Sequence, residues 1–453
     1  MKTINPATGK LIKEYSEMSS LEVTRIIENA NKAQGLWKQK SFGQRSVNLH
    51  KIAELLNERK EELGNLMTEE MGKPTSEAVG EIEKCAWVCE YYAEKAENFL
   101  ANDSVETEAS KSYVTFNPLG TVLSIMPWNF PFWQLFRFAA PALMAGNAVI
   151  LSHSENVTGS ALEIEKLIRD AGISKDLFRT ILVESENMKP IIQHKGIAAV
   201  TLTGSTRAGK IVASQAGEAL KKTVLELGGS DPSIILADAD IKASAESCVT
   251  SRLLNSGQSC IAAKRFVIVE EVYDEFVSEF KKLMESKKLG DPFEDGTDVG
   301  PMARIDLRDG LHEQVQKSIK KGAKATIGGE KPGAAGAFYP VTMLENVQKG
   351  MPAYDEELFG PVASMIKVKD EQEAIKVAND SIYGLGASIY SADVEKAEKI
   401  AAEQLEAGCC FVNEFVKSDP RLPFGGIKNS GYGRELGLYG IREFVNIKTV
   451  YVK

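Results

Sequence analysis

Residues 198–229 read AAVTLTGSTRAGKIVASQAGEALKKTVLELGG, and this stretch decides the fold class of the 453-residue chain. Apolar runs at residues 198–202 and 223–227 flank a glycine-containing turn and an amphipathic segment, which is the order strand, turn, helix, strand. The runs are continuous rather than alternating, as in strands that are buried on both faces of a parallel sheet. The stretch therefore predicts an α/β unit in which a helix connects two parallel strands.

The same alternation continues on both sides of this stretch. Apolar runs predict further strands at residues 148–151, 180–183, 233–236 and Arg265–Val269, with an amphipathic helix over residues 272–287. Nearer the N-terminus, apolar residues recur with helical spacing over residues 45–71, where Gly72-Lys73-Pro74 ends the pattern. We therefore expect two α/β units that meet near Gly228-Gly229.

Two short segments fall outside this alternation. Residues 112–116 and 448–452 are rich in residues that favour strands, and each lies beside a polar stretch. They are expected to form edge strands that pair outside the main sheets. Because an exposed edge strand can pair with another chain, we expect a homo-oligomer.

The composition is that of a soluble globular protein, with 43% apolar and 26% charged residues. A chain of this length exceeds one simple core, which predicts two or three domains. The net charge of −9 is spread without long blocks, which argues against nucleic acid or an anionic membrane as a partner. Polar residues and prolines interrupt the apolar segment at residues 122–151, so it falls short of the ~20 residues that a membrane span needs.

The compartment is inferred from the first residues and from the cysteines. Met1-Lys-Thr-Ile-Asn5 contains no apolar signal segment, so we expect a cytoplasmic protein whose six cysteines are free thiols. A structural zinc site is not expected, because no Cys-x-x-Cys pair occurs. A regulatory disulfide within Cys85/Cys89 or Cys409/Cys410 stays an open alternative.

Cys260 and Glu226 are the residues that we expect to carry the chemistry. Cys260 follows the small polar residues of Asn255-Ser-Gly-Gln-Ser, which indicate an accessible turn or a helix start. A cysteine reacts as the thiolate, and a helix N-terminus would help to form it. Glu226 ends an apolar run before two glycines, where a carboxylate could activate water after the thiol has attacked. The alternatives are a small buried cysteine and an exposed strand end.

Asn129 is a candidate for stabilising negative charge. It stands between Trp128 and Phe130 and is bracketed by Pro127 and Pro131. An amide held rigidly by such neighbours is a good donor to an oxyanion, because a preorganised donor loses little energy to reorganisation. Its alternative role is to satisfy the backbone of a turn.

The segment Gly204-Ser-Thr-Arg-Ala-Gly209-Lys210-Ile211 follows a predicted strand and opens a predicted helix. It is close to the phosphate-binding loop of nucleotide hydrolases, but Ile211 stands where a hydroxyl should hold magnesium. A helix N-terminus still binds phosphate through its backbone N–H groups. We therefore expect a nucleotide-phosphate site without NTPase chemistry.

These motifs, taken in order, resemble those of the aldehyde dehydrogenase superfamily, whose members use NAD or NADP. They are Ile4-Asn-Pro-Ala-Thr-Gly9, Pro127-Trp-Asn-Phe-Pro131, Thr203-Gly-Ser205, Leu225-Glu-Leu-Gly-Gly229, Gly257-Gln-Ser-Cys260, Glu356-Glu-Leu-Phe-Gly-Pro361 and Pro423-Phe-Gly-Gly-Ile-Lys-Asn-Ser-Gly431. Within the superfamily, the chain is most similar to the succinate-semialdehyde dehydrogenase-like branch.

The resemblance implies the aldehyde dehydrogenase fold, an α/β fold with two Rossmann-like, doubly wound parallel-sheet domains and a small β oligomerisation element. The NAD-binding domain would take residues 1–101 and 119–227, and the catalytic domain residues 228–439. The oligomerisation element would take residues 102–118 and 440–453, with a hairpin that pairs with the C-terminal strand. The expected assembly is a homodimer or a homotetramer.

The resemblance also implies a mechanism. Cys260 attacks the aldehyde carbon, while the Asn129 side chain and the Cys260 backbone N–H stabilise the oxyanion. Hydride passes to the nicotinamide, and Glu226 then activates the water that hydrolyses the thioester. The implied cofactor contacts are Ser205 with the pyrophosphate, Glu357 with the nicotinamide ribose and Phe359 with the nicotinamide, together with Trp128, Gly204 and Leu227.

One position departs from the family pattern. Ser152 stands where a lysine usually binds the adenine ribose, so a 2′-phosphate would lose its cationic partner. Glu155 matches a position whose carboxylate accepts a hydrogen bond from the ribose 2′-OH and repels that phosphate. NAD is therefore the expected cofactor and NADP the alternative, with His153 as a candidate source of positive charge.

The expected substrate is succinic semialdehyde, which would be oxidised to succinate. Arg137 matches an arginine that grips the distal carboxylate in succinate-semialdehyde dehydrogenases, through bidentate hydrogen bonds. The second arginine of those enzymes is Leu254 here, and Ser418 and Arg421 lie in the loop that forms the substrate mouth. Arg421 is the expected replacement for the missing charge. The alternative role of Arg137 is a structural salt bridge.

Three other functions compete with this expectation. They are a dehydrogenase of another small or medium aldehyde, a cysteine esterase or hydrolase, and a non-catalytic protein on the same fold. A hydrolase would leave Ser205 and Glu357 without a role. A non-catalytic chain is expected to have lost Cys260, Glu226 or Asn129, and all three are present.

Overall fold

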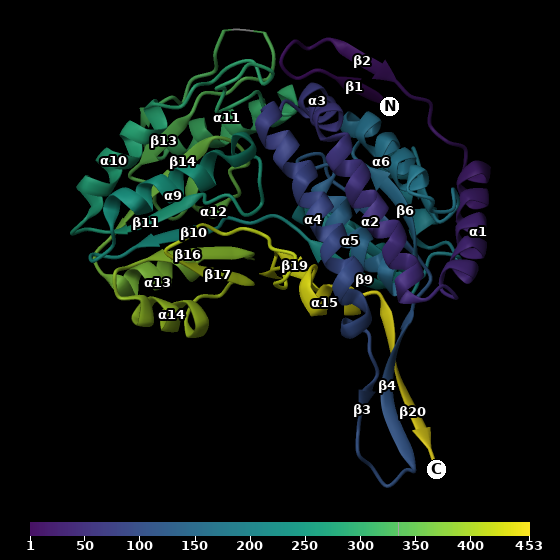
Figure 1. Ribbon diagram of the computed structural model, residues 1–453. Helices are drawn as coiled ribbons and strands as arrows, with labels where there is room; N and C mark the ends of the chain where they lie inside the picture. Colours follow the sequence, from purple (N-terminus) through teal and green to yellow (C-terminus); the bar gives the residue numbers. More distant parts are fainter. Residues whose placement is uncertain (334) are drawn as a thin grey trace.

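The computed structural model describes residues 1–333 and 335–453, which form two large sheets covered by helices and a projecting β arm (Figure 1). The first sheet has the strand order β19-β9-β8-β5-β6-β7, in which β5 to β9 are parallel and β19 is antiparallel to β9. Its strands are β5 (Thr121–Met126), β6 (Ala148–His153), β7 (Phe178–Thr180), β8 (Ala199–Thr203), β9 (Lys222–Glu226) and β19 (Gly431–Tyr432).

Helices cover this sheet and connect its strands. The connecting helices are α5 (Trp133–Ala145), η1 (Glu155–Val157), α6 (Thr158–Asp170), η2 (Ser185–Asn187), α7 (Met188–Ile192) and α8 (Thr206–Glu218). Before the sheet come β1 (Lys2–Ile4), β2 (Leu11–Glu14), α1 (Ser20–Trp37), α2 (Phe42–Glu58), α3 (Lys60–Met71) and α4 (Thr75–Phe99). The long helix α4 packs against α2, α3 and α5, which brings its side chains next to the loops that follow the sheet.

The second sheet has the order β12-β13-β14-β11-β10-β16-β17, parallel except for the β12–β13 pair. Its strands are β10 (Pro232–Ile235), β11 (Arg265–Val269), β12 (Lys324–Ile327), β13 (Thr342–Glu345), β14 (Val362–Val368), β16 (Gly386–Tyr390) and β17 (Cys409–Val412). The helices around it are α9 (Ile241–Leu253), η3 (Leu254–Gly257), α10 (Tyr273–Glu285), α11 (Ile305–Lys320), α12 (Pro352–Asp355), α13 (Glu371–Asn379) and α14 (Val394–Glu403). The predicted α/β class with parallel sheets is confirmed.

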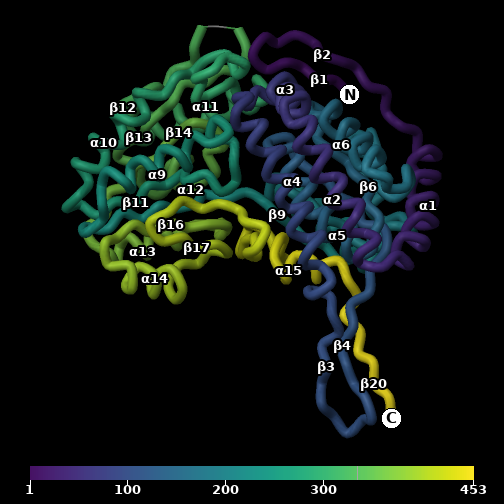
Figure 2. The backbone as a smooth tube through the Cα atoms, in the orientation of Figure 1, coloured from purple at the N-terminus to yellow at the C-terminus, as the bar shows by residue number. Residues whose placement is uncertain are grey.

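A β arm projects from the body and carries the C-terminus at its tip (Figure 2). It consists of β3 (Asp103–Ser104), β4 (Lys111–Pro118) and β20 (Val445–Val452). Strand β20 pairs antiparallel with β4 along its whole length, from Val445 opposite Pro118 to Val452 opposite Lys111. The two segments predicted as edge strands therefore pair with each other, outside the two large sheets.

Short elements complete the chain. The pair β15 (Tyr383–Gly384) and β18 (Ile427–Lys428) is antiparallel, and α15 (Gly437–Arg442) leads into the arm. Strand β19, inside the range predicted for the catalytic domain, pairs with β9 of the first sheet. The predicted domain bounds stay a prediction. No helix in residues 1–333 and 335–453 combines the length and apolar character needed to cross a bilayer.

Two local predictions differ from the structure. The strand expected at residues 180–183 lies nearer the N-terminus in the structure, at Phe178–Thr180. The single helical period over residues 45–71 is two helices, broken at Arg59, whose φ and ψ of −107° and 12° leave the helical region. The Arg59 guanidinium binds both Glu62 and Glu163, so a long-range ion pair accompanies the break.

Candidate active site

The candidate site lies where neighbouring parallel strands of the first sheet end. Strand β5 leads into Pro127 and Asn129, β8 leads into Gly204, and β9 ends at Glu226. The carboxyl ends of neighbouring parallel strands meet at one edge of a sheet, which is where ligands bind in open α/β folds. Cys260 comes to this edge from the second sheet, in the loop before β11.

Cys260 lies between two cavities. The first cavity has a volume of about 290 Å³ and the second about 260 Å³. The first is lined by Glu77, Gly80, Glu81, Lys84, Phe130, Trp133, Gln134, Arg137, Leu254, Ser259, Cys260, Ile261, Val416, Lys417, Ser418 and Phe424. The second is lined by Pro127, Trp128, Asn129, Gln134, Thr203, Gly204, Ser205, Leu227, Gly228, Cys260, Leu307, Glu357 and Phe359. One thiol can therefore reach a ligand in either cavity.

The loop that carries Cys260 is a turn between η3 and β11, so the alternative of a helix start is wrong. Asn255, Ser256 and Gly257 have positive φ angles in succession, which turns the chain sharply after α9. A Cβ on Gly257 would lie 2.3 Å from the carbonyl oxygen of Gly360, so only glycine fits there. No helix N-terminus polarises the thiol in this described loop.

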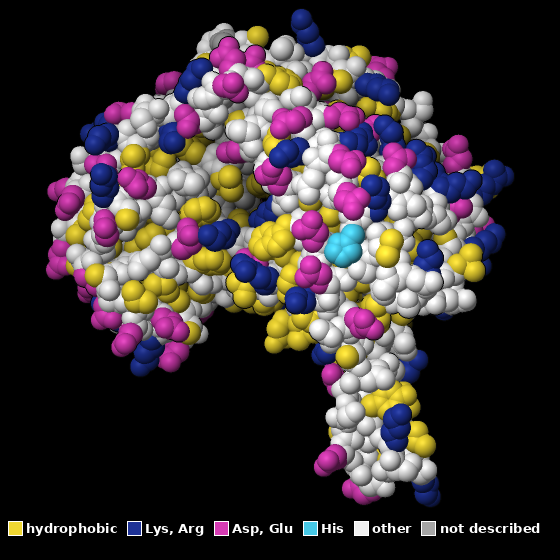
Figure 3. Space-filling model, in the orientation of Figure 1, with side chains coloured by type: hydrophobic (Ala, Val, Ile, Leu, Met, Phe, Trp, Pro, Cys, Tyr) yellow, Lys and Arg dark blue, Asp and Glu magenta, His cyan; other side chains and the backbone are white. Residues whose placement is uncertain are grey.

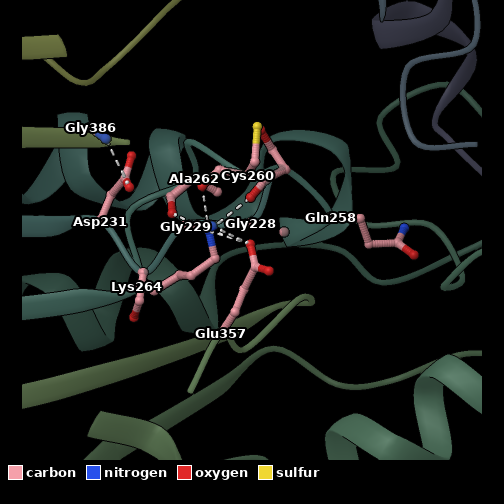
Figure 4. Close-up of polar contacts among 12 residues, drawn as sticks. Gly228, Gly229, Asp231, Gln258, Cys260, Ala262, Lys264, Glu357 and Gly386 are labelled. Atoms are coloured by element: carbon pink, nitrogen blue, oxygen red, sulfur yellow. Dashed lines mark hydrogen bonds and ion pairs between the residues drawn. The ribbon is translucent and has the colours of Figure 1, made fainter. Parts of the chain in front are cut away.

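Lys264 holds this loop from below (Figure 4). Its buried ammonium donates hydrogen bonds to the carbonyl oxygens of Ser259, Cys260 and Ala262, at 2.9, 2.8 and 3.1 Å. The Cys260 sulfur points away from the ammonium, while the Cys260 carbonyl faces it. Because three carbonyls share one cation, the backbone at the nucleophile is held in place.

Burial raises the pKa of the Cys260 thiol to about 12, and the positive charges of Arg137 and Lys264 oppose that shift. At neutral pH the thiol is therefore protonated in this structure. A cysteine attacks as the thiolate, so the reaction needs a group that accepts the thiol proton.

Glu226 is a buried carboxyl group next to Gly425. A Cβ on Gly425 would lie 2.7 Å from Glu226 Oε1, and neither carboxyl oxygen has a hydrogen-bond partner among the described residues. Burial, reinforced by the charge of Glu435, raises its pKa well above the usual value. The alternative of an exposed strand end is wrong. Glu226 does not appear in the described lining of either cavity.

Asn129 is buried beside the same loop. Its Nδ2 donates to the carbonyl oxygen of Gln258 at 3.1 Å, and its own carbonyl oxygen accepts from Asn255 Nδ2 at 2.7 Å. These contacts hold the amide against the segment before Cys260. The oxyanion role of Asn129 stays a prediction.

The second cavity has the features of a dinucleotide site. Trp128 and Phe359 meet edge to face, with ring centroids 5.7 Å apart, and Glu357 Oε1 accepts from the backbone N–H of Gly229 at 3.0 Å. Ser205 caps the thirteen-residue helix α8, and its Oγ accepts from Ala208 N at 3.2 Å. The helix N-terminus and the aromatic pair fit a pyrophosphate and a planar ring, respectively.

Glycines allow close packing at this cavity and next to it. A Cβ on Gly228 would lie 2.3 Å from Glu357 Oε2, and one on Gly209 would lie 2.5 Å from Leu227 Cδ1. Gly209 therefore serves the packing of α8 against the end of β9. Six predicted cofactor residues come together here: Trp128, Gly204, Ser205, Leu227, Glu357 and Phe359.

Two predicted cofactor residues lie away from this cavity. Ser152 is buried near the end of β6, and its Oγ lies 3.6 Å from Met188 Sδ. Glu155 begins η1, is exposed, and lies near Arg304. His153 is buried with Nε2 3.0 Å from the Pro131 carbonyl oxygen, and burial lowers its pKa to about 4. It is therefore neutral at pH 7 and is not the source of positive charge that was considered.

The first cavity contains two of the three predicted substrate residues. Arg137 lines it, but its guanidinium forms a buried ion pair with Glu435 and stacks over the Phe424 ring. Ser418 also lines it and accepts hydrogen bonds from Lys84 Nζ at 2.9 Å and Trp133 Nε1 at 3.1 Å. Arg421 does not belong to the described lining. It is exposed and binds Asp419 through two nitrogens.

The sequence analysis missed Lys84. It lies on α4 and lines the first cavity together with Cys260 and Ser418. No local signal distinguishes it from the other lysines of the chain, because its partner Ser418 is 334 residues away. Only the packing of α4 against the loop before β18 brings the two residues together.

Comparisons with known proteins agree with this geometry. The sequence pattern of the aldehyde dehydrogenase family matches residues 1–450. A probable NADP+-dependent succinate-semialdehyde dehydrogenase of Synechocystis is 46% identical over 450 residues, which are 99% of both chains. A succinate semialdehyde dehydrogenase of Escherichia coli, named for NAD(P)+, is 42% identical over 449 residues, covering 99% of this chain and 97% of the other.

A solved structure extends the similarity to the fold. The succinic semialdehyde dehydrogenase of Streptococcus pyogenes, in complex with NADP+, superposes with a TM-score of 0.97 and is 37% identical. The match covers 100% of this chain and 99% of the other. The fold implied by the sequence motifs is therefore confirmed.

Proposed function

The chain belongs to the aldehyde dehydrogenase family, and from this premise we propose that it oxidises succinic semialdehyde to succinate. It is an enzyme of the class that converts an aldehyde to its acid with NAD(P)+. The observation that carries the substrate proposal is the position of Cys260 between the two cavities. The cationic side chains of Lys84, Arg137 and Lys417 line the first cavity, and Cys260 lines both cavities.

In the proposed mechanism, the Cys260 thiol gives its proton to solvent, and the resulting thiolate attacks the aldehyde carbon from the first cavity. Asn129 Nδ2 and the Cys260 backbone N–H donate hydrogen bonds to the oxyanion. A nicotinamide cofactor, when bound in the second cavity, supplies the hydride acceptor. Glu226 then takes a proton from water, whose oxygen attacks the thioester and releases the acid and the Cys260 thiolate.

We also propose that NAD is preferred over NADP. The exposed carboxylate of Glu155 supports this preference, because it can accept from a ribose 2′-OH and would repel a 2′-phosphate. The neutral, buried His153 offers such a phosphate no charge. Several similar proteins are named for NADP+, so the cofactor must be compared directly.

The test of function is a rate measurement on purified protein. Absorbance of the reduced nicotinamide is followed with NAD or NADP and with succinic semialdehyde or butanal, a neutral aldehyde with the same number of carbons. We expect the fastest turnover with NAD and succinic semialdehyde and none in Cys260→Ala. Turnover of butanal alone would refute the substrate, and a faster reaction with NADP would refute the cofactor preference.

We propose that the β arm joins protomers into a homodimer or homotetramer. Hydrophobic side chains lie on its surface (Figure 3), among them Val105, Ile447, Tyr451 and Val452. An exposed apolar strand pair favours contact with a second copy. Light scattering after gel filtration should give a multiple of 49.5 kDa, and a monomer at micromolar concentration would refute the assembly.

A further inference from the structure

The ammonium of Lys84 lies at the wall of the first cavity. It donates to Ser418 Oγ at 2.9 Å and sits 4.3 Å from the centroid of the Trp133 ring. Lys84, Trp133 and Ser418 all line the cavity that Cys260 lines. They come from α4, α5 and the loop before β18, so three separate segments build this corner.

Lys84 differs from the other charged groups of this cavity. Three of those groups have an ion-pair partner: Glu81 with Lys73, Arg137 with Glu435, and Lys417 with Glu414. Glu77 accepts a hydrogen bond from the backbone N–H of Asn255. Within residues 1–333 and 335–453, Lys84 has no carboxylate at ion-pair distance, and its polar partner is the neutral Ser418.

A half-buried ammonium without a counter-charge is unfavourable. Burial, together with the charge of Arg137, lowers the pKa of Lys84 to about 8. An anion placed beside it would restore the missing electrostatic partner. The cavity wall is therefore complementary to a negative group on a ligand.

The free donors of this corner match a carboxylate. An ammonium has three N–H donors, and one of them binds Ser418, so two remain. Ser418 Oγ already accepts from Lys84 and from Trp133 Nε1, so its own hydrogen is left to donate. No acceptor for that hydrogen lies among the described residues. Two donors from Lys84 and one from Ser418 can satisfy two carboxylate oxygens.

We propose that Lys84 and Ser418 bind the distal carboxylate of the aldehyde substrate while its carbonyl carbon faces Cys260. This inference rests on the proposed function, because it assumes a substrate with a second, anionic end. It assigns the charge recognition to Lys84 rather than to the arginines. The Arg137 guanidinium forms an ion pair with Glu435, and Arg421 forms an ion pair with Asp419 outside the cavity.

The test compares two substrates in one set of variants of the full-length enzyme. The kcat/KM for succinic semialdehyde is divided by that for butanal in wild type, Lys84→Met, Lys84→Arg and Lys95→Met. Lys95 is the matched control, because it is exposed on the same helix. We expect the ratio to fall at least ten-fold in Lys84→Met, mainly through KM, to recover largely in Lys84→Arg, and to stay within two-fold in Lys95→Met.

The outcomes separate the two proposals. A wild type without preference for succinic semialdehyde overturns the proposed substrate. A wild type with the preference, retained within two-fold in Lys84→Met, overturns the assignment of Lys84 alone. If Lys84→Met does not fold, Ser418→Ala replaces it, because this change removes one donor and the anchor of the ammonium. A ratio unchanged in Ser418→Ala then overturns the inference.

Discussion

The Lys264 ammonium donates a hydrogen bond to the carbonyl oxygen of Cys260 at 2.8 Å and lies 3.6 Å from Glu357 Oε1 (Figure 4). One buried cation therefore touches both the backbone of the candidate nucleophile and the carboxylate that faces the second cavity. The position of the thiol and the position of this carboxylate depend on the same side chain.

Replacing Lys264 by methionine should destabilise the protein and slow the reaction. The change leaves three buried carbonyl oxygens without a donor, which should lower the free energy of unfolding by about 3 kcal/mol. Urea unfolding followed by circular dichroism measures this loss, and kcat is expected to fall with it. The control is Lys282→Met, whose side chain is 77% exposed. Equal stability of the two variants would contradict the structural role of Lys264.

Gly228→Ala should weaken cofactor binding. The new Cβ would lie 2.3 Å from Glu357 Oε2, so the carboxylate must move and lose its bond to Gly229 N. Loss of one charge-assisted hydrogen bond should raise the KM for the cofactor about ten-fold. Gly217→Ala, on a helix with nothing within 4 Å of the new Cβ, is the control. An unchanged KM in Gly228→Ala would remove Glu357 from the cofactor site.

Glu226→Gln should separate the two halves of the reaction. Without the base, the thioester at Cys260 is not hydrolysed, so rapid mixing should show one burst of reduced cofactor per site. The later steady rate should fall about 100-fold. Because burial raises the pKa of Glu226, the wild-type hydrolysis rate should increase as pH rises and the carboxyl group ionises. A steady rate equal to that of wild type would show that another group activates water.

Glu155→Gln should shift the cofactor preference toward NADP. The substitution removes the negative charge that would face a 2′-phosphate and keeps a hydrogen-bonding side chain of the same length. We expect the ratio of kcat/KM for NADP over NAD to rise about ten-fold. Glu186→Gln, at an exposed position of η2, serves as the comparison. The same ratio in all three proteins would exclude Glu155 from cofactor selection.

The preference for succinic semialdehyde should depend on pH through Lys84. Burial, together with the charge of Arg137, lowers the pKa of Lys84 to about 8, whereas Cys85, Glu81 and Asp419 act in the opposite direction. The ammonium is present below this pH, so the ratio of kcat/KM for succinic semialdehyde over butanal should fall as pH rises from 7 to 9.5. In Lys84→Arg the ratio should stay level, because a guanidinium remains charged. A level wild-type profile would contradict the prediction.

Much of the fold follows from local pattern. The strand predicted at Arg265–Val269 has these bounds in the structure, and the two stray β segments are strands β4 and β20. The continuous helix predicted over residues 45–71 is wrong at Arg59, where the chain leaves helical geometry and the guanidinium pairs with the distant Glu163. Periodicity reports which faces are apolar, and it does not report where one helix ends and the next begins on the same face.

The reacting groups and the alternation of strands and helices were readable from the chain, because both are carried by neighbouring residues. The electrostatic state of those groups was decided in three dimensions. Burial in the assembled fold raises the pKa of both Glu226 and Cys260, and Arg137 is paired because Glu435 packs beside it. Lys84 faces the thiol's cavity only because α4 meets a loop from the far end of the chain. Burial and pairing are properties of the packed molecule, since they depend on contacts that no local segment contains.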